Sequence, residues 1–379
     1  MNQGIINKNT VTINKFLRDK QADSKQKLTI SKYKTNLNQF AISLNKDKAE
    51  ATQEDIKSLV IKIQNSELAE ETKNRKKLHI RIFYTWLNKP ELVSFIKIKT
   101  RESNYKLPED MLTQDEVMAM IQAGDVQDKA FISLLYESGM RAGEIRFIQL
   151  KHVKFDDEKA TITIPQGKTG ARRIMVVDSV PYLKAWIGSK NVNPERYLFV
   201  TKDNKNRPWN STVMNQRIKR LAYLAKIKKR IYPHLFRHSR ATFLAGLVSE
   251  QILKQYLGWV KDSNMASVYV HLSGKDTDSA MMSKVYNIAN SNEVKKEIEE
   301  YKLKPRTCEY CNTSNEATSI FCVKCSKPLT KEARIEYEYN KDKDIEDLRA
   351  AFIQLVHDLA KDRPDVKPNM TKILNKIEK

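Results

Sequence analysis

Apolar residues recur at intervals of three or four along much of the first hundred residues. This spacing places them on one face of a helix. The pattern predicts a helical domain over residues 1–100. The positions that set it are Ile56, Leu59, Val60 and Ile63 in one segment and Leu78, Ile82, Phe83, Trp86 and Leu87 in a later one.

A polar and basic segment follows, and a second region begins after it. Residues 101–110 include Pro108 and are expected to form a linker. A helix is expected to begin at Thr113, because Glu116 three residues later completes a capping box. The pattern therefore places a domain boundary near residue 110.

The middle of the chain mixes helices with a few short strands. The β-type runs 161–164 and 172–177 flank the sequence QGKTG, which predicts a hairpin with Lys168 at its tip. Helical spacing covers 212–227 and 237–257. We therefore expect a mainly α domain with a small β-hairpin or sheet.

Residues 331–379 are expected to form a helical tail. Its apolar residues follow spacings of three and four, as in a coiled-coil seam. Because only two heptads carry the pattern, docking of this helix and oligomerisation through it both remain open. The residues are Ile345, Leu348, Phe352, Leu355 and Leu359.

The chain is strongly basic. Its 379 residues include 68 Lys and Arg against 46 Asp and Glu, which leaves a net charge of +22. Half of this excess lies in the first 106 residues, with 22 basic and 11 acidic residues. Such a surface concentrates polyanions, so nucleic acid is the first expected partner. The alternative for the N-terminal domain is a helical cap whose lysines face water.

An anionic membrane is the second partner to consider. The chain has no apolar run near the roughly 18 residues that a spanning helix needs, and its first residues lack the apolar core of an export signal. Residues 219–230 form a basic amphipathic stretch that could lie on a membrane, but a DNA-facing helix fits its neighbours better. We expect a cytoplasmic, nucleoid-associated protein with no membrane partner.

The cysteines form one cluster within residues 302–330. Two Cys-x2-Cys pairs offer four thiolates to a single tetrahedral Zn²⁺, and four protein ligands leave no open position for catalysis. We therefore predict a zinc ribbon with one structural ion. The redox alternative needs a thioredoxin-like βαβ context that the pattern lacks, and this cysteine usage favours a reducing compartment. The predicted ligands are Cys308, Cys311, Cys322 and Cys325.

Several basic residues and a late tyrosine point to phosphodiester chemistry. Arginine forks can grip the non-bridging oxygens of a phosphate and offset the charge that grows in the transition state. A tyrosine hydroxyl can attack phosphorus if a base takes its proton, and a lysine can protonate the leaving 5′ oxygen. The residues are Arg141, Lys168, His234, Arg237 and Tyr269. Together they suit a transesterification of DNA that needs no metal.

Here the chain resembles the tyrosine recombinases, the family of phage-type integrases and Xer-like recombinases. The motifs SGMRAGE, HLFRHSRATFL, LGW and SVYVHL match in order and approximate spacing, over residues 107–289. More weakly, the N-terminal helices stand where the family has its core-binding domain. The later KDTDSAM run, followed by the cysteine pairs, resembles an archaeal branch of the family.

The resemblance implies a role for each matching residue. Tyr269 is the nucleophile that forms a 3′-phosphotyrosine, Arg141 and Arg237 clamp the scissile phosphate, and Lys168 protonates the 5′ leaving oxygen. His234 handles the tyrosine proton.

Two more matching residues support this machinery. Glu144 holds Arg141 in place. Trp259 stands where the family carries His or Trp, so its indole N–H would donate to a phosphate oxygen while its ring supports the tyrosine helix. A plain core role for Trp259 is the alternative.

Other assignments remain open at several positions. The interval from the LGW motif to Tyr269 is one residue longer than the commonest family pattern, which leaves Tyr256 and Tyr286 as rival nucleophiles. The register of a hairpin varies, so Arg172 or Arg173 could partly replace Lys168.

The two histidines of the HLFRH motif have a separate alternative. His234 and His238 stand four residues apart and could bind a metal on one helix face. However, no third ligand is evident, and Arg237 between them would repel a cation. His238 is expected to have a structural or supporting role.

The expected architecture is a two-domain clamp around duplex DNA, with the basic domain of residues 1–100 on one face and a catalytic domain of residues 111–290 on the other. The resemblance implies a site-specific recombinase that integrates or excises a mobile element. Two protomers would bind each crossover site and four would form the synapse, while the sequence leaves open whether the free protein is a monomer. The helix at 277–289 is where the family passes a segment to its neighbour.

Two alternative functions share this fold. A type IB-like topoisomerase would use the same cleavage chemistry and relax DNA without strand exchange. A non-catalytic architectural protein would bind DNA only, but such a protein has no chemical reason to keep every polar residue of the site.

Overall fold

The computed structural model describes residues 3–98, 110–165, 167, 170–188, 193–201, 206–272 and 301–362. Within it the chain forms two compact units, residues 1–105 and 106–379. Each unit has its own hydrophobic core. No helix among the described residues is long and apolar enough to cross a membrane.

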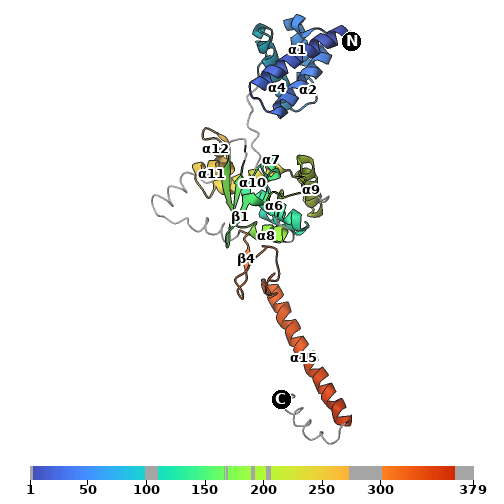
Figure 1. The fold of residues 1–379 in the computed structure, drawn as a ribbon, viewed down its shortest axis with the longest axis vertical. Helices are drawn as coiled ribbons and strands as arrows, with labels where there is room; N and C mark the ends of the chain where they lie inside the picture. The colour runs from blue at the N-terminus through green and yellow to red at the C-terminus, as the bar shows by residue number, and fades with distance from the viewer. Residues whose placement is uncertain are drawn as a thin grey trace. The chain divides into compact units, whose positions relative to one another are not determined.

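The first unit is a bundle of helices (Figure 1). Phe16 lies at the centre of its core, where its ring makes edge-to-face contacts with Tyr33, Phe83 and Trp86. The periodicity that predicted helices around Ile56 and Phe83 is confirmed, since both side chains are fully buried. The helices are α1 (Gln3–Ala22), α2 (Lys27–Leu44), α3 (Gln53–Gln64) and α4 (Glu70–Trp86), with short 3₁₀ turns at Lys48–Glu50 and Pro90–Val93.

The second unit contains a mainly helical body and a small sheet, which confirms the predicted fold class. The helix expected at Thr113 is present, and its capping box with Glu116 is formed. In chain order the elements are α5 (Gln114–Gln122), α6 (Val126–Ser138), α7 (Ala142–Arg146), a 3₁₀ turn (Leu150–His152), β1 (Val153–Phe155), β2 (Ala160–Ile164), β3 (Arg172–Val176), α8 (Val180–Gly188), α9 (Ser211–Leu224), α10 (Pro233–Ala245), α11 (Glu250–Leu257) and α12 (Met265–Leu272).

The predicted hairpin is part of a three-stranded antiparallel sheet with the order β1-β2-β3. Ile162 pairs with Val153 on one side and with Ile174 on the other. Alternate residues of β2 are buried, as expected for a strand with one face against the core. Ile164 and Arg172 are the last paired residues before the turn that contains Gly167.

The helical run expected at 237–257 is divided in the structure. The first helix, α10, already begins at Pro233, where the missing N–H of proline costs no hydrogen bond. It ends at Gly246, and α11 starts after Ser249. The break turns the chain, so α11 and then α12 pack back against α10.

The cysteine-containing segment forms a small two-stranded ribbon of β4 (Arg306–Thr307) and β5 (Ser314–Asn315). Tyr301 connects it to the helical body: its hydroxyl donates to Asp178 Oδ2 at 2.5 Å, and its ring stacks on Phe243 of α10 at 5.4 Å between centroids. Lys129 and Glu316 form a further ion pair at 3.3 Å. The ribbon is therefore docked on the helical body of the second unit.

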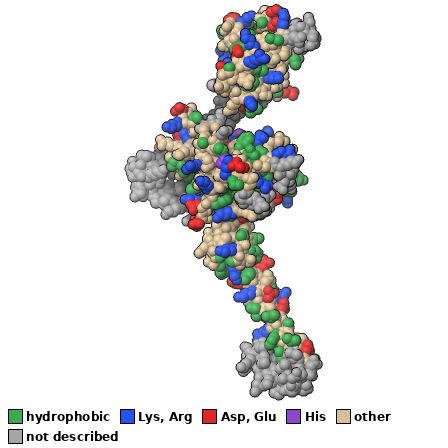
Figure 2. Space-filling view, in the orientation of Figure 1, with side chains coloured by type: hydrophobic (Ala, Val, Ile, Leu, Met, Phe, Trp, Pro, Cys, Tyr) green, Lys and Arg blue, Asp and Glu red, His purple; other side chains and the backbone are tan. Residues whose placement is uncertain are grey.

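The C-terminal tail contains the predicted long helix, α15 (Lys331–Asp362). Ile345, Leu348, Phe352 and Leu355 are exposed along it, so the structure identifies no occupant for this apolar stripe. Figure 2 shows these helical turns with apolar and charged side chains interspersed, and Lys and Arg side chains spread over the visible face of each unit. The side chain of Leu359 and the segment 277–289 lie outside the described residues.

Candidate active site

The site is built where two helices end beside the start of a third. Gly139 ends α6 and Gly258 ends α11, both with left-handed backbone (φ 55° and 64°). The last carbonyls of a helix have no partner within it and carry partial negative charge. Helix α10 packs against both α6 and α11, and its label lies within the helical body in Figure 1. Cations on α10 and nearby loops can satisfy these carbonyls.

Arg237 on α10 does so and is buried. Its Nη1 donates to Gly139 O at 2.8 Å and its Nη2 donates to Leu257 O at 2.7 Å. Burial and the charge of Arg141 lower the pKa of Arg237 to about 9, so the guanidinium remains charged at neutral pH. The side chain is thus a fixed cation that also joins the ends of α6 and α11.

Arg141 lies at the start of α7 and is held from two directions. Its Nη1 donates to Glu144 Oε1 at 2.9 Å, and its Nη2 donates to Gly258 O at 3.1 Å. Its backbone N–H also donates to Glu144 Oε2. The predicted partnership of Arg141 with Glu144 is therefore present, and the guanidinium is partly open to solvent.

Glu144 has a second partner that the sequence did not reveal. Arg172 of β3 donates from both terminal nitrogens to the two carboxylate oxygens at 2.8 Å. Burial alone would raise the pKa of Glu144, but the hydrogen bonds from Arg172 and Arg141 outweigh it and lower this pKa to about 2. The carboxylate stays ionised and links the hairpin to Arg141.

Gly258 is packed directly against Arg172. A Cβ at this position would lie 2.7 Å from Arg172 Cζ, and the backbone is left-handed. We expect Gly258→Ala to push Arg172 away from Glu144 and to add strain of about 1–2 kcal/mol. If Arg141 shifts by about 1 Å as a result, DNA cleavage, the reaction that the resemblance implies, should slow on the order of 10²-fold.

The control is Gly143→Ala on α7, because a Cβ at Gly143 would have no neighbour within 4 Å. The rate of single-turnover cleavage of a DNA substrate is measured for both variants. Equal rates for the two alanine variants would contradict the role given to Gly258.

Tyr269 on α12 is almost completely buried, with 3% of its surface exposed. Its ring stacks on Trp259, with 5.5 Å between centroids and 9° between planes. The Arg237 guanidinium lies over the Trp259 ring at 5.3 Å. Burial raises the pKa of Tyr269 to about 12 although the charge of Arg237 opposes this. The phenol is therefore protonated at rest and needs a base before it can act as a nucleophile.

The hydrogen-bond partner that the structure gives the Tyr269 hydroxyl is His238 Nδ1. His234 lies one turn earlier on α10, with its side chain exposed. Partial desolvation and the charges of Arg237 and Arg141 lower the pKa of His234, so it is a neutral imidazole beside the two arginines. The resemblance assigns the tyrosine proton to His234, and the sequence predicts a structural or supporting role for His238. In the structure, His238 is the histidine that contacts the Tyr269 hydroxyl.

Lys168 lies outside the described residues, as do Gln166 and Thr169. Its neighbour Gly167 is close to the site, because a Cβ built there would lie 3.2 Å from Glu144 Oε1. The hairpin that carries Lys168 thus ends beside Glu144. Of the two possible substitutes for Lys168, Arg172 is hydrogen-bonded to Glu144, and the side chain of Arg173 is exposed.

The structure therefore brings together five of the residues that the sequence proposed for the site: Arg141, Glu144, Arg237, Trp259 and Tyr269. It adds Arg172 and His238. The sequence signal for His238 was its position four residues after His234. That spacing fits a pair of metal ligands and a histidine with a structural role equally well. For Arg172 the only signal was a basic residue next to the hairpin tip.

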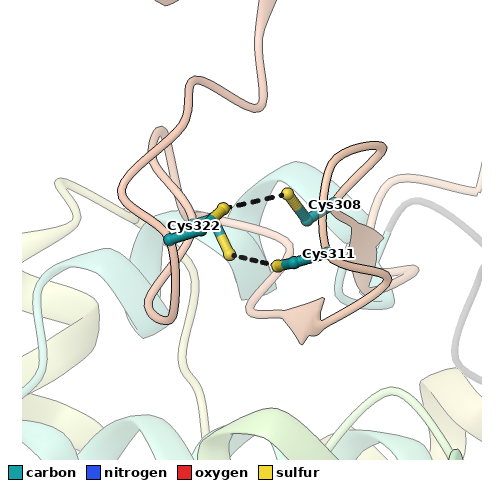
Figure 3. A group of neighbouring side chains, drawn as sticks. Cys308, Cys311 and Cys322 are labelled. Carbon is teal, nitrogen blue, oxygen red and sulfur yellow. Dashed lines mark hydrogen bonds between the residues drawn. The ribbon is translucent and has the colours of Figure 1, made fainter.

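The cysteines form a separate cluster in the ribbon, and it could bind a metal. All four Sγ atoms lie within 4.8 Å of one another. Cys308 lies 3.5 Å from Cys325, and Cys311 lies 3.5 Å from Cys322, sulfur to sulfur (Figure 3). The backbone N–H of Lys324 points to Cys322 Sγ at 3.4 Å, which stabilises a thiolate.

The chain is similar to known recombinases. Residues 110–275 match the Phage integrase family. A tyrosine recombinase of Thermosipho africanus is 26% identical over 270 residues, which cover 67% of this chain and 92% of that protein.

Solved structures share the fold. The XerH site-specific recombinase in a post-cleavage complex with its palindromic difH substrate has a TM-score of 0.54 and 17% identity, covering 71% of this chain and 82% of that one. A λ integrase tetramer bound to a Holliday junction has a TM-score of 0.54 and 14% identity, covering 71% and 79%.

Proposed function

We propose that Tyr269 is the nucleophile of strand exchange by this tyrosine recombinase, whose residues 110–275 match the Phage integrase family. The observation that carries this assignment is the stack of Tyr269 on Trp259, with Arg237 over the same indole ring. It places a buried hydroxyl next to a fixed cation. The rival Tyr256 instead donates its hydroxyl to Glu137 O at 3.1 Å.

The proposed step exchanges one phosphodiester for another. Tyr269 Oη attacks the phosphorus, the bond from phosphorus to the 5′ oxygen breaks, and a 3′-phosphotyrosine forms. Lys168 gives a proton to the 5′ oxygen. The 5′ hydroxyl of the partner strand then reverses the reaction, so the exchange needs neither nucleotide hydrolysis nor a metal ion.

Arg141 and Arg237 bind the two non-bridging oxygens and stabilise the charge that grows on them. Glu144 and Arg172 keep Arg141 in position. The exposed imidazole of His234, beside both arginines, faces the same phosphate, and the indole N–H of Trp259 donates to one of its oxygens. This role for His234 differs from the one that the resemblance implies.

The test is a covalent complex formed in EDTA. The full-length protein is incubated with nicked duplexes whose sequence was selected by binding from a randomised pool, and products are separated on a denaturing gel. We expect an adduct that retains the label of the DNA end bearing the 3′ phosphate, with the linkage on the Tyr269 peptide by mass spectrometry. A 5′ linkage or a requirement for Mg²⁺ would refute the assignment.

For assembly, we propose two protomers on each crossover site and four in the synapse. The shared fold with the λ integrase tetramer on a Holliday junction supports this proposal. The basic residues of the first unit would contact DNA phosphates, which makes affinity fall steeply with salt. Relaxation of supercoiled DNA by a single protomer would instead indicate a topoisomerase. Integration or excision of a mobile element, and membership of an archaeal branch, are further proposals.

The ribbon is proposed to hold one structural Zn²⁺ through Cys308, Cys311, Cys322 and Cys325. We expect one zinc ion per chain by native mass spectrometry, and its loss in Cys322→Ser together with local unfolding of the ribbon, because a core this small needs the metal. Adduct formation should persist, since these cysteines lie outside the catalytic cluster. Equal zinc content in both proteins would contradict the proposal.

A further inference from the structure

The proposed function assigns no role to His238, although this residue contacts the proposed nucleophile. It follows Arg237 directly on α10, and its Nδ1 is hydrogen-bonded to the Tyr269 hydroxyl. The two rings lie 5.8 Å apart between centroids. His238 is half-buried, in contrast to the exposed His234. The contact therefore lies inside the cluster, shielded from bulk water.

We propose that His238 is the base that takes the Tyr269 proton when the tyrosine attacks DNA. This inference rests on the proposed function, because it assigns a role only if Tyr269 is the nucleophile. It makes His238 a catalytic residue, since it touches the reacting hydroxyl. His234 then contacts only the phosphate of the DNA.

The protonation states are consistent with this role. A phenol hydroxyl can donate to Nδ1 only when Nδ1 carries no proton, so the neutral imidazole has its proton on Nε2. During cleavage the proton moves from Tyr269 Oη to Nδ1 as the bond from Oη to phosphorus forms. During rejoining, Nδ1–H returns the proton to Oη as that bond breaks. One histidine thus serves both directions, and no proton is lost.

The electrostatic surroundings explain why the transfer would wait for DNA. The positive charge of Arg237 acts on the Tyr269 hydroxyl, and positive charge disfavours an imidazolium beside that hydroxyl. A bound phosphate offsets this charge. Placing the base and the phosphate-binding Arg237 on consecutive residues of one helix also holds them in a constant mutual geometry.

The decisive comparison uses a matched pair, His238→Asn and His234→Asn. Asparagine can still accept a hydrogen bond from the phenol but cannot take its proton. We expect His238→Asn to slow single-turnover cleavage by about 10²–10⁴-fold, the usual contribution of a general base. DNA affinity and thermal stability should stay close to those of the wild type.

The second readout separates a lost base from a disturbed site. A trifluorinated tyrosine, whose phenol is more acidic, is placed at position 269 by nonsense suppression in the wild type and in both variants. A more acidic phenol needs a base less. We expect fluorination to accelerate His238→Asn at least about tenfold more than it accelerates the wild type or His234→Asn, a recovery within the general-base contribution.

The outcomes are distinct. An equal effect of fluorination in all three proteins, a larger effect in His234→Asn, or wild-type cleavage by His238→Asn would each overturn the role of His238. Failure of the proposed function gives a different result, because the unmodified wild-type protein would then form no adduct through Tyr269.

Discussion

Tyr269→Phe is expected to abolish covalent complex formation and strand exchange while DNA affinity stays unchanged. The substitution removes one oxygen, the atom that would bond to phosphorus, and keeps the ring that stacks on Trp259. The fold should therefore persist. Gel analysis of adducts and a salt titration of DNA binding measure the two effects separately.

Tyr256→Phe is the matched control. Tyr256 is also a partly buried tyrosine near the end of α11, but its hydroxyl bonds to the carbonyl of Glu137. Loss of that hydrogen bond should cost about 1 kcal/mol of stability and leave the adduct intact. An adduct that survives in Tyr269→Phe and disappears in Tyr256→Phe would transfer the nucleophile to Tyr256.

The second large effect is expected for Arg237→Lys. Lysine keeps the charge but lacks the planar fork that reaches Gly139 O and Leu257 O at once. A donor aimed at the developing charge would be lost, which costs about 10²–10³-fold in cleavage rate. One buried carbonyl would also lose its partner, at about 1–3 kcal/mol of stability.

Single-turnover cleavage at saturating DNA and urea unfolding measure the two parts of this prediction. Arg173→Lys is the control, because Arg173 lies on β3 next to Arg172 with an exposed side chain. Arg173→Lys should leave the cleavage rate and the free energy of unfolding close to those of the wild type. A cleavage rate for Arg237→Lys equal to that of the control would contradict a phosphate-binding role for Arg237.

Local patterns predicted much of what the structure contains. The capping box at Thr113 and the hairpin strands both depend on residues a few positions apart. The division of 237–257 into two helices was missed. Gly246 and Ser249 mark it, but the periodicity of apolar residues continues across the break, because α10 and α11 bury their faces against the same core.

The candidate site shows the same limit. Arg141 and Glu144 are three residues apart, so their pairing follows from a single helical turn. The bond of Arg141 to Gly258 spans 117 positions and that of Arg172 to Glu144 spans 28. No spacing rule connects such residues, and the sequence treated Arg172 only as a substitute for Lys168.

By itself the sequence determined the residue types: the arginines, the histidines and the tyrosine that phosphodiester chemistry needs, and four cysteines in metal-ligand spacing. It also determined the helices that carry them, because helix signals are local. Only the tertiary structure decided which histidine touches Tyr269 and which arginine supports Glu144. Both choices depend on how α12 and β3 pack against the α10 and α7 region, and that packing is set by burial of the whole core.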